Sequence, residues 1–344
     1  MNHDAMNDDT MSHMPILSRR RLALAAAALV GLAHAGTVLA APWPQSAITI
    51  VVPASPGSSL DQNVRKAGEE LARMLKQPVV IENRAGAGGS LALASVARAK
   101  PDGYTIGIAN TASIAISPEL AKKPTYDPIQ SFDFIGRFTS QPNVLVVRPD
   151  LPAKTVAELT AFAKANPDKL VMGSQGVGST GHLSGEMYRK ADGASFTHVP
   201  YRSGPQAIQD LLGGRVDFLF ENVSTILPHI EQGKVRALAV TSAQRNPRLP
   251  AVPTMNEAGV KGYEASSWAG LVVPAGTPAD VVALLSSALQ EVQRTPSFAS
   301  FVTDRGGTVE TSTPAAFKAF AVAERSKWGT LVRSIPGLKD DADR

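Results

Sequence analysis

Short apolar runs rich in valine and isoleucine recur along the chain between turn residues. Each run is continuous rather than alternating in hydrophobicity, so we expect a strand that is buried on both faces. The seven runs cover residues 48–52, 79–81, 104–108, 144–147, 216–220, 235–240 and 271–273. Strands of this kind are typical of parallel sheets that helices cover on both sides.

Between these runs, apolar residues return every three or four positions, which predicts amphipathic helices. In the first gap, Val64, Ala67, Leu71 and Leu75 form one such stripe. Similar stripes run through residues 151–165, 205–212, 278–293 and 314–332. For the helix predicted at 278–293, Thr277 is the expected N-cap and Pro278 the first helical residue. Strands that alternate with helices predict an α/β protein built from βαβ units.

The first forty residues predict a secretory signal peptide. Arg19, Arg20 and Arg21 precede an uncharged, alanine-rich run over 22–40 that ends in small side chains. We expect removal of residues 1–40 by cleavage after Ala40. The motif SRRRL at 18–22 also resembles a twin-arginine signal, so ordinary and twin-arginine export both stay open, with ordinary export favoured. A compact signal begins at Met14, which we expect to be the true start.

Removing 40 of the 344 residues leaves 304, which fits two lobes of ordinary domain size. Irregular stretches at 141–143 and 263–270 join dense strand and helix blocks. We interpret both as crossovers. The predicted first lobe is then discontinuous, 41–143 plus 265–344, and the second lobe is 144–264. Two crossovers would act as a hinge that closes the lobes over a ligand.

Composition narrows the chemistry. The sequence contains no cysteine, which excludes disulfides, thiolate metal sites and cysteine nucleophiles. No segment after the signal approaches the roughly 18 uninterrupted apolar residues of a membrane span, so we expect a soluble mature protein. The formal net charge is +4, without a clustered basic stripe. This balance favours small anions weakly and argues against nucleic acid as a partner.

Small and hydroxylated residues follow the predicted strands and open the predicted helices. The loop ASPGSSLD at 54–61 is the first case, and either Ser58 or Ser59 could cap the helix behind it, Ser59 and Gln62 having capping-box spacing. Loops at 82–90 and 173–181 repeat the design. Unpaired N–H groups at a helix start can hold an anion without a lysine or arginine. Each loop could equally be a tight turn with a cap.

Other chemistries find weaker support. The stretch at 176–181 matches G-x-G-x-x-G, but HVPYR at 198–202 lacks the acidic residue that a dinucleotide site needs, and no phosphate-binding loop is present. Ser179, a histidine among His182, His198 and His229, and Asp217 could form a hydrolytic triad on paper, but no G-x-S-x-G elbow accompanies them. No His or carboxylate pair has metal-ligand spacing. We therefore predict no cofactor, no metal and no catalytic residue.

Seven ordered stretches make the mature chain resemble the Bug-type extracytoplasmic solute receptors, the substrate-binding subunits of tripartite tricarboxylate transporters. They are IVVP at 50–53, PG at 56–57 with Asp61, ENRAGAGG at 82–89, PDGYT at 101–105, HVPYR at 198–202, GKVRALAV at 233–240 and PAGTP at 274–278. The resemblance implies a type II periplasmic binding protein-like fold, two α/β lobes joined by two crossover strands. It also implies a periplasmic receptor that holds a small carboxylate in the cleft between the lobes and hands it to permease subunits.

Carried over by matching motif, the resemblance implies ligand contacts from both lobes. The first lobe would contribute Ala54, Ser55, Gly57, Ser58, Ser59, Asp61, Asn110, Thr111 and Ser113. The second would contribute Ser174, Gln175, Gly178, Ser179, Thr180, Tyr201, Arg202, Asp217 and Phe220. Trp268 either lines the cleft beside its crossover or belongs to the core, and Tyr201 with Arg202 either contacts a second anionic group or lies on the surface.

Two departures from the family pattern bear on the ligand. Ala54 stands where the family usually has an aromatic residue, and Ser58 where it usually has a second glycine. Our hypothesis is that Ala54 leaves space for a bulkier or aromatic carboxylate, while Ser58 and Ser59 add donors. We predict a monomeric, non-enzymatic receptor. A receptor that presents its ligand to a membrane sensor kinase and a periplasmic hydrolase are the alternatives.

Overall fold

A computed structural model describes residues 42–167 and 169–341. The chain from Pro44 onward forms one compact unit. The predicted signal peptide, residues 1–40, lies outside the described residues. Within the described ranges, no helix is both long enough and apolar enough to cross a membrane.

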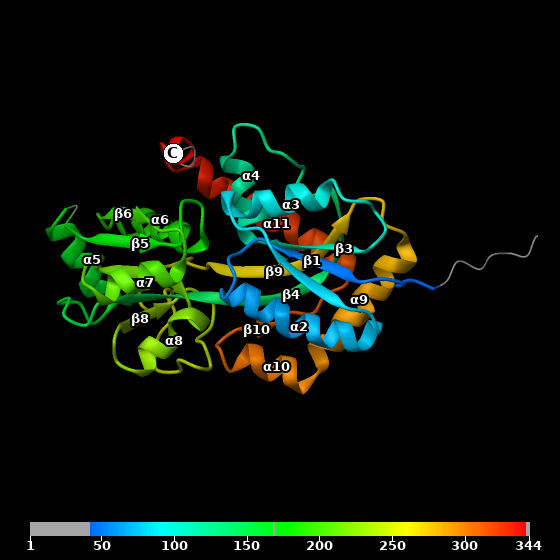
Figure 1. Cartoon of the computed structure of the whole chain (residues 1–344). Coiled ribbons are helices and arrows are strands. Elements are labelled where there is room, and N and C mark those ends of the chain that lie inside the picture. The colour runs from blue at the N-terminus through cyan, green and yellow to red at the C-terminus, as the bar shows by residue number, and fades with distance from the viewer. Residues whose placement is uncertain (1–41, 168, 342–344) are drawn as a thin grey trace, which may run out of the picture. The chain divides into compact units, whose positions relative to one another are not determined.

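Parallel strands form the first half-sheet, and their carboxyl ends lead into the predicted anion loops. Strand β1 pairs in parallel with β2 and with β3, while β9 runs antiparallel to both β3 and β4 (Figure 1). The strands are β1 (Ile48–Val52), β2 (Val79–Asn83), β3 (Thr105–Asn110), β4 (Phe132–Val147), β9 (Ser266–Pro274) and the short β10 (Thr308–Val309), which pairs with β4.

The second half-sheet repeats this plan. Strand β5 pairs in parallel with β6 and β7, and β7 and β8 both pair antiparallel with the end of β4. The strands are β5 (Val171–Ser174), β6 (Thr197–Pro200), β7 (Phe218–Asn222) and β8 (Arg236–Val240). The sheet as a whole is mixed rather than purely parallel, because β4 and β9 run against their neighbours.

Strand β4 belongs to both half-sheets. Its residues 132–142 pair with β9, whereas Asn143 to Val147 pair with β7. The change of partner falls between Pro142 and Asn143, inside the stretch predicted as a crossover. The lobe boundaries at 143/144 and 264/265 stay predictions.

Helices cover both faces of the sheet (Figure 1). Over the first half-sheet, α2 packs with α9 and α10, while α3 and α11 share a core with Trp268 on the other side. Over the second, α5 and α6 line one apolar cluster and α7 and α8 another. The principal helices are α2 (Ser59–Leu75), α3 (Ser90–Ala97), α4 (Ser117–Leu120), α5 (Val156–Ala165), α6 (Thr180–Asp192), α7 (Gly204–Leu212), α8 (Val223–Glu231), α9 (Ala279–Arg294), α10 (Pro296–Thr303), α11 (Pro314–Arg333) and α12 (Leu338–Asp341).

Most predicted elements are present, with local differences. The first strand has the predicted bounds, while β5, β6 and β10 had not been predicted because their sequences are short or polar. Pro278, not Thr277, is the residue before α9. The buried Thr277 hydroxyl donates to Pro274 O at 2.7 Å, so it closes the preceding turn instead of capping the helix.

Candidate functional site

Asp61 organises the loop that follows β1. Its carboxylate is 2% exposed and accepts from Gly57 N at 2.8 Å, Arg65 Nε at 3.0 Å and Asn83 Nδ2 at 2.9 Å. Burial raises the pKa of Asp61, but the hydrogen bonds from Arg65, Asn83 and Gly57 outweigh it and leave that pKa below its usual value. Asp61 therefore holds the loop as a fixed anion, and its oxygens are engaged within the protein.

The two serines of this loop have separate roles. Ser58 is the N-cap of α2, because its hydroxyl accepts from Asp61 N at 3.3 Å. Ser59 is the first helical residue, and its hydroxyl donates to Gln141 Oε1 at 3.0 Å. The loop thus offers backbone groups at the start of a helix, and one hydroxyl that reaches toward the middle of the sheet.

The glycine loop after β2 packs against the loops after β1 and β3. Gly88 and Gly89 both have positive φ, 59° and 89°. A Cβ at Gly89 would lie 2.8 Å from Pro53 Cβ and 3.1 Å from Ser113 Cβ, and one at Gly88 would lie 1.9 Å from Ser117 Oγ. Only glycine allows this backbone conformation together with this approach. The loops that follow β1, β2 and β3 therefore meet at one edge of the first half-sheet.

Polar side chains of the loop after β3 bond within the protein. Asn110 and Ser113 form a reciprocal capping box, with Ser113 N donating to Asn110 Oδ1 at 2.8 Å and Asn110 N donating to Ser113 Oγ at 3.1 Å. Thr111 Oγ1 accepts from Trp268 N at 2.9 Å. These predicted ligand residues hold the loop in place.

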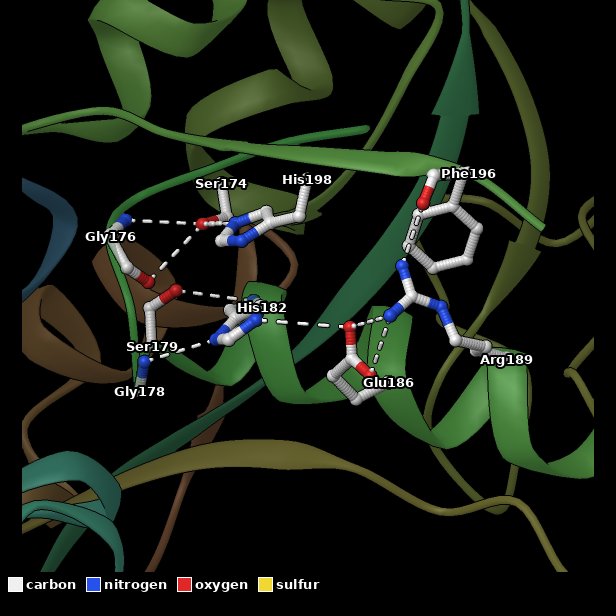
Figure 2. A network of polar contacts seen from close by, with 9 residues as sticks. All are labelled: Ser174, Gly176, Gly178, Ser179, His182, Glu186, Arg189, Phe196 and His198. Atoms are coloured by element: carbon white, nitrogen blue, oxygen red, sulfur yellow. Dashed lines mark hydrogen bonds and ion pairs between the residues drawn. The ribbon is translucent and has the colours of Figure 1, made fainter. Parts of the chain in front are cut away.

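Two stacked histidines hold the loop after β5 (Figure 2). The rings of His182 and His198 lie 3.9 Å apart at an angle of 11°. His182 Nδ1 accepts from Gly178 N at 3.1 Å, and His198 Nε2 shares a hydrogen bond with Ser174 Oγ at 2.7 Å. Ser179 caps α6 by accepting from His182 N at 3.1 Å. The pair thus fixes both ends of the glycine-rich loop at 174–179.

The histidine stack is electrically neutral at His182. Burial, together with the charges of His198 and Arg189, lowers the pKa of His182 to about 3. Because Nδ1 accepts from Gly178, the neutral ring carries its proton on Nε2, which lies 3.9 Å from Glu186 Oε1. Burial raises the pKa of Glu186, and Arg189 opposes that rise. A groove of 760 Å³ is lined by these residues and by Pro336 and Leu338 of the C-terminal segment.

The loops of the two half-sheets touch. A Cβ at Gly178 would lie 2.7 Å from Leu120 Cδ1 and 3.4 Å from Ile116 Cγ2, so glycine lets the second loop approach α4 and the segment before it. Leu120 and Ile116 belong to the first half and share an apolar cluster with Leu183 of α6. The facing edges of the half-sheets are therefore in contact in this structure.

Two polar clusters also link the half-sheets near the crossover. In the first, Ser224 Oγ lies 2.8 Å from Ser59 Oγ and 2.7 Å from Gln141 Oε1. In the second, Ser267 Oγ lies 2.7 Å from Thr180 Oγ1 and 3.2 Å from Asn222 Oδ1. Gln141 and Ser267 face each other across β4 and β9. Sequence reasoning placed Gln141 and Ser267 only within crossovers and missed Asn222 and Ser224. Asn222 ends β7 and Ser224 lies in the first turn of α8, so their one signal was a position near the end of a buried strand.

The buried carboxyl group of Glu221 lies against the first residue of α7. It is 2% exposed, and its carboxyl oxygens would lie 2.6 Å and 3.1 Å from a Cβ at Gly204, the first residue of α7. Burial raises the pKa of Glu221 to about 7, against the Asn222 backbone N–H and the nearby Gln175 amide. A carboxyl of the protein thus lies where a bound anion would gain from this helix start.

Of the predicted residues on the neighbouring loop, Tyr201 donates its hydroxyl to Asp210 Oδ2 at 2.8 Å, and Arg202 lies on the surface beside the groove. These contacts favour the surface interpretation of the pair.

Three of the predicted ligand residues have side chains that the fold itself engages. Asp217 lies before β7, at the end of the strand opposite to its loop, and accepts from Arg148 Nε and Val171 N, both at 2.8 Å. Phe220 is buried in the α6 cluster. Trp268 is 3% exposed, packs edge-on against Phe317 and donates to Glu324 Oε2 at 2.8 Å, contacts that favour the core interpretation.

Ser179, His182 and Asp217 do not form the hydrolytic triad that the sequence allowed. Asp217 is bonded to Arg148 and Val171, and His182 Nδ1 accepts from the Gly178 backbone, while Ser179 Oγ accepts from the His182 backbone. In the described part of the chain, no group of three histidines and carboxylates is placed to hold a metal ion.

Comparison with known proteins gives consistent matches over most of the chain. The family model described as tripartite tricarboxylate transporter family receptor matches residues 63–336. Protein BugT of Bordetella pertussis is 33% identical over 312 residues, which cover 89% of this chain and 96% of BugT.

Two solved structures share the fold. One, from R. palustris with adipate, is 33% identical with a TM-score of 0.81, and the match covers 85% of this chain and 98% of that one. The other, MatC from Rhodopseudomonas palustris with bound malate, is 31% identical with a TM-score of 0.78, covering 84% and 100%.

Proposed function

Because this chain belongs to the tripartite tricarboxylate transporter receptor family, we propose that it captures a small organic carboxylate between its two half-sheets for uptake by a transporter of that type. The predicted Bug-type membership and the type II periplasmic binding fold, two α/β lobes joined by two crossover strands, are confirmed. The protein is a periplasmic solute-binding protein. Its ligand and its membrane partner are our proposals.

The observation that carries the carboxylate proposal is that two capped helix starts, one from each half-sheet, both bond to side chains of the crossover strands β4 and β9. The starts of α2 and α6 come from opposite half-sheets, and Ser59 and Thr180 in their first turns belong to the two linking clusters. Residues 54–61 and 174–181 contain no lysine or arginine. Backbone N–H groups and helix dipoles would therefore hold the carboxylate. The adipate and malate bound to the two related structures support this class of ligand.

Closure follows from the way the halves are joined. Two chain segments cross between the half-sheets, and their facing loops are joined by the two small polar clusters, the Gly178 contact and the apolar packing of Ile116 and Leu120 against Leu183. We propose that these contacts form around the ligand and that the closed form is what the transporter recognises. We infer export through the N-terminal signal, action as a monomer, and no catalytic role. Presentation to a sensor kinase remains the alternative use of the same closed form.

A thermal-shift screen of the mature protein against carboxylates tests the proposal, because stabilisation grows with ligand concentration over Kd. The panel includes adipate, malate, succinate, benzoate and 4-hydroxybenzoate, with neutral sugars as controls. At least one carboxylate should raise the melting temperature in a saturable way. The two aromatic acids test the hypothesis that Ala54 leaves space for a bulkier ligand. A panel with no stabilising carboxylate would contradict the proposed function.

A further inference from the structure

Asn143 is a buried amide that the fold leaves unused. It is 1% exposed and lies where β4 passes from one half-sheet to the other. Its backbone is satisfied, because Asn143 N donates to Thr241 Oγ1 at 2.8 Å and Thr241 N donates to Asn143 O at 2.9 Å. Neither Nδ2 nor Oδ1 of its side chain has a hydrogen-bond partner among the described residues. Such groups are rare in native proteins, because burial without a partner is costly.

Strand alternation gives the direction in which this amide points. Leu145 and Val147 belong to the apolar cluster of α5 and α6, whereas Val144 and Val146 belong to that of α7 and α8. Successive side chains of a strand point to opposite faces, so Asn143 lies on the α6 face. Its partner in the register is Asn222, which by the same alternation follows Phe218 and Phe220 on that face.

The α6 face changes from apolar to polar at this row. Asn222 accepts from Ser267, which is bonded to Thr180 in the first turn of α6. One turn further along, Ser184 Oγ is fully buried, and it also has no hydrogen-bond partner in the described ranges. Asn143 is thus the register partner of a member of the second linking cluster, and Asn222 and Ser267 connect its row to Thr180, a residue of the proposed carboxylate site.

The chain segments around this row supply no cation, and the carboxylate among them, Glu186, is paired with Arg189 at 3.0 Å. Residues 143–147 of β4 and 180–188 of α6 contain no lysine or arginine. A full negative charge buried here would lack a cation, and such burial costs far more than burial of a neutral polar group. An amide offers both a donor and an acceptor, so it suits a group that also has both.

We propose that Asn143 recognises a neutral hydroxyl or carboxamide group of the ligand, and that the substrate is a carboxylate carrying such a group. The carboxylate would lie at the helix starts, and the neutral group at the Asn143 row. This inference rests on the proposed function and names its substrate class.

A stability measurement first separates recognition from a structural role. Asn143→Leu replaces an unsatisfied amide by an apolar group of similar size, so the urea midpoint should stay unchanged or rise. Asn246 is the matched control, being 5% exposed, donating to Gly306 O at 2.8 Å and accepting from Arg248 N at 2.9 Å. Asn246→Leu should lower the midpoint. If Asn143→Leu lowered it as much, and Asn143→Ala did too, the amide would have a structural role and the inference would fail.

Calorimetry with matched ligand pairs then tests recognition. The pairs are malate with succinate, and 4-hydroxybenzoate with benzoate, each differing by one hydroxyl. In at least one pair the wild-type protein should prefer the hydroxylated acid about tenfold or more, and Asn143→Leu or Asn143→Ala should remove that preference while changing affinity for the other acid less than about threefold.

A preference that survives in both variants would overturn the inference. If the wild-type protein binds adipate or other carboxylates but never prefers the hydroxylated member, this inference fails and the proposed function stands. If no carboxylate binds, the proposed function itself fails.

Discussion

The two edges that meet at the crossover are built differently. On the first half-sheet, the loops after β1, β2 and β3 pack on one another. The side chains of Asp61, Asn110 and Ser113 form hydrogen bonds within these loops. On the second, buried side chains with shifted pKa values, His182 and Glu221, lie next to the loops, and the side-chain amide of Asn143 has no hydrogen-bond partner among the residues that the structure describes.

This difference suggests a division of labour. A rigid edge that offers backbone N–H groups can hold any carboxylate of suitable size, because these groups interact only with the negative charge of the carboxylate. An edge that offers neutral side chains can distinguish what the rest of the ligand carries. We therefore expect changes on the first edge to abolish binding in general, and changes on the second to alter selectivity or pH dependence.

The largest effect should come from Asp61→Ala on the first edge. It removes the acceptor of Gly57, Arg65 and Asn83, so we expect a loss of roughly 3 to 5 kcal/mol in unfolding free energy, measured by urea denaturation. Binding of every carboxylate should be lost together in calorimetry. Asp304→Ala, at an exposed position, is the control and should change neither. If the variant lost binding of one carboxylate and kept the others, the first edge would determine selectivity, against the expected division between the two edges.

Glu221 should give the second edge a pH signature. Its pKa is raised to about 7 in the folded protein, above the usual value near 4.3, so the unfolded state loses its proton first. Stability from this group is therefore full below about pH 4 and is lost as pH rises toward 7, by about 3 kcal/mol. Glu221→Gln should remove this part of the pH dependence in urea denaturation between pH 4.5 and 7.5. An identical profile in the variant would show that another group is responsible.

His182→Phe should have a smaller effect, confined to one loop. The variant keeps the size and stacking of the ring but removes the acceptor of Gly178 N, which costs about 1 to 2 kcal/mol. We expect affinity to fall about tenfold, and amide exchange of Gly178 to accelerate. Because the pKa of His182 is about 3, wild-type affinity should not depend on its titration between pH 5 and 8. An unchanged rate of amide exchange at Gly178 would show that His182 does not hold the loop.

Ser224→Ala should have the smallest effect. It removes a hydroxyl bonded to Ser59 and Gln141, which still bond each other at 3.0 Å. We expect a change below about 1 kcal/mol in stability, and a faster ligand dissociation measured by stopped flow, because the cluster links the two halves. A slower dissociation would show that the cluster resists closure.

Sequence patterns predicted the longer helices and the first strands, because continuous apolar runs and helical stripes are local signals, but gave no indication of α8 and α10. They missed β5, β6 and the first part of β4, whose Gly136, Arg137 and Thr139 interrupt the apolar pattern. The candidate loops follow from small residues after strands. The roles of Asp217, Phe220 and Trp268 did not, because burial and ion pairing depend on tertiary neighbours. Asn143 carries no sequence signal, since its side-chain amide is seen to lack a partner only among the packed residues of the described structure.

A crystal structure of the mature protein with the carboxylate that stabilises it most tests the proposed site directly. We expect the ligand between the two edges, with its carboxylate oxygens within hydrogen-bond distance of backbone N–H groups in residues 54–59 or 176–180. A ligand bound instead in the groove beside His198 and Pro336, or on one half-sheet without contact to the other, would contradict it.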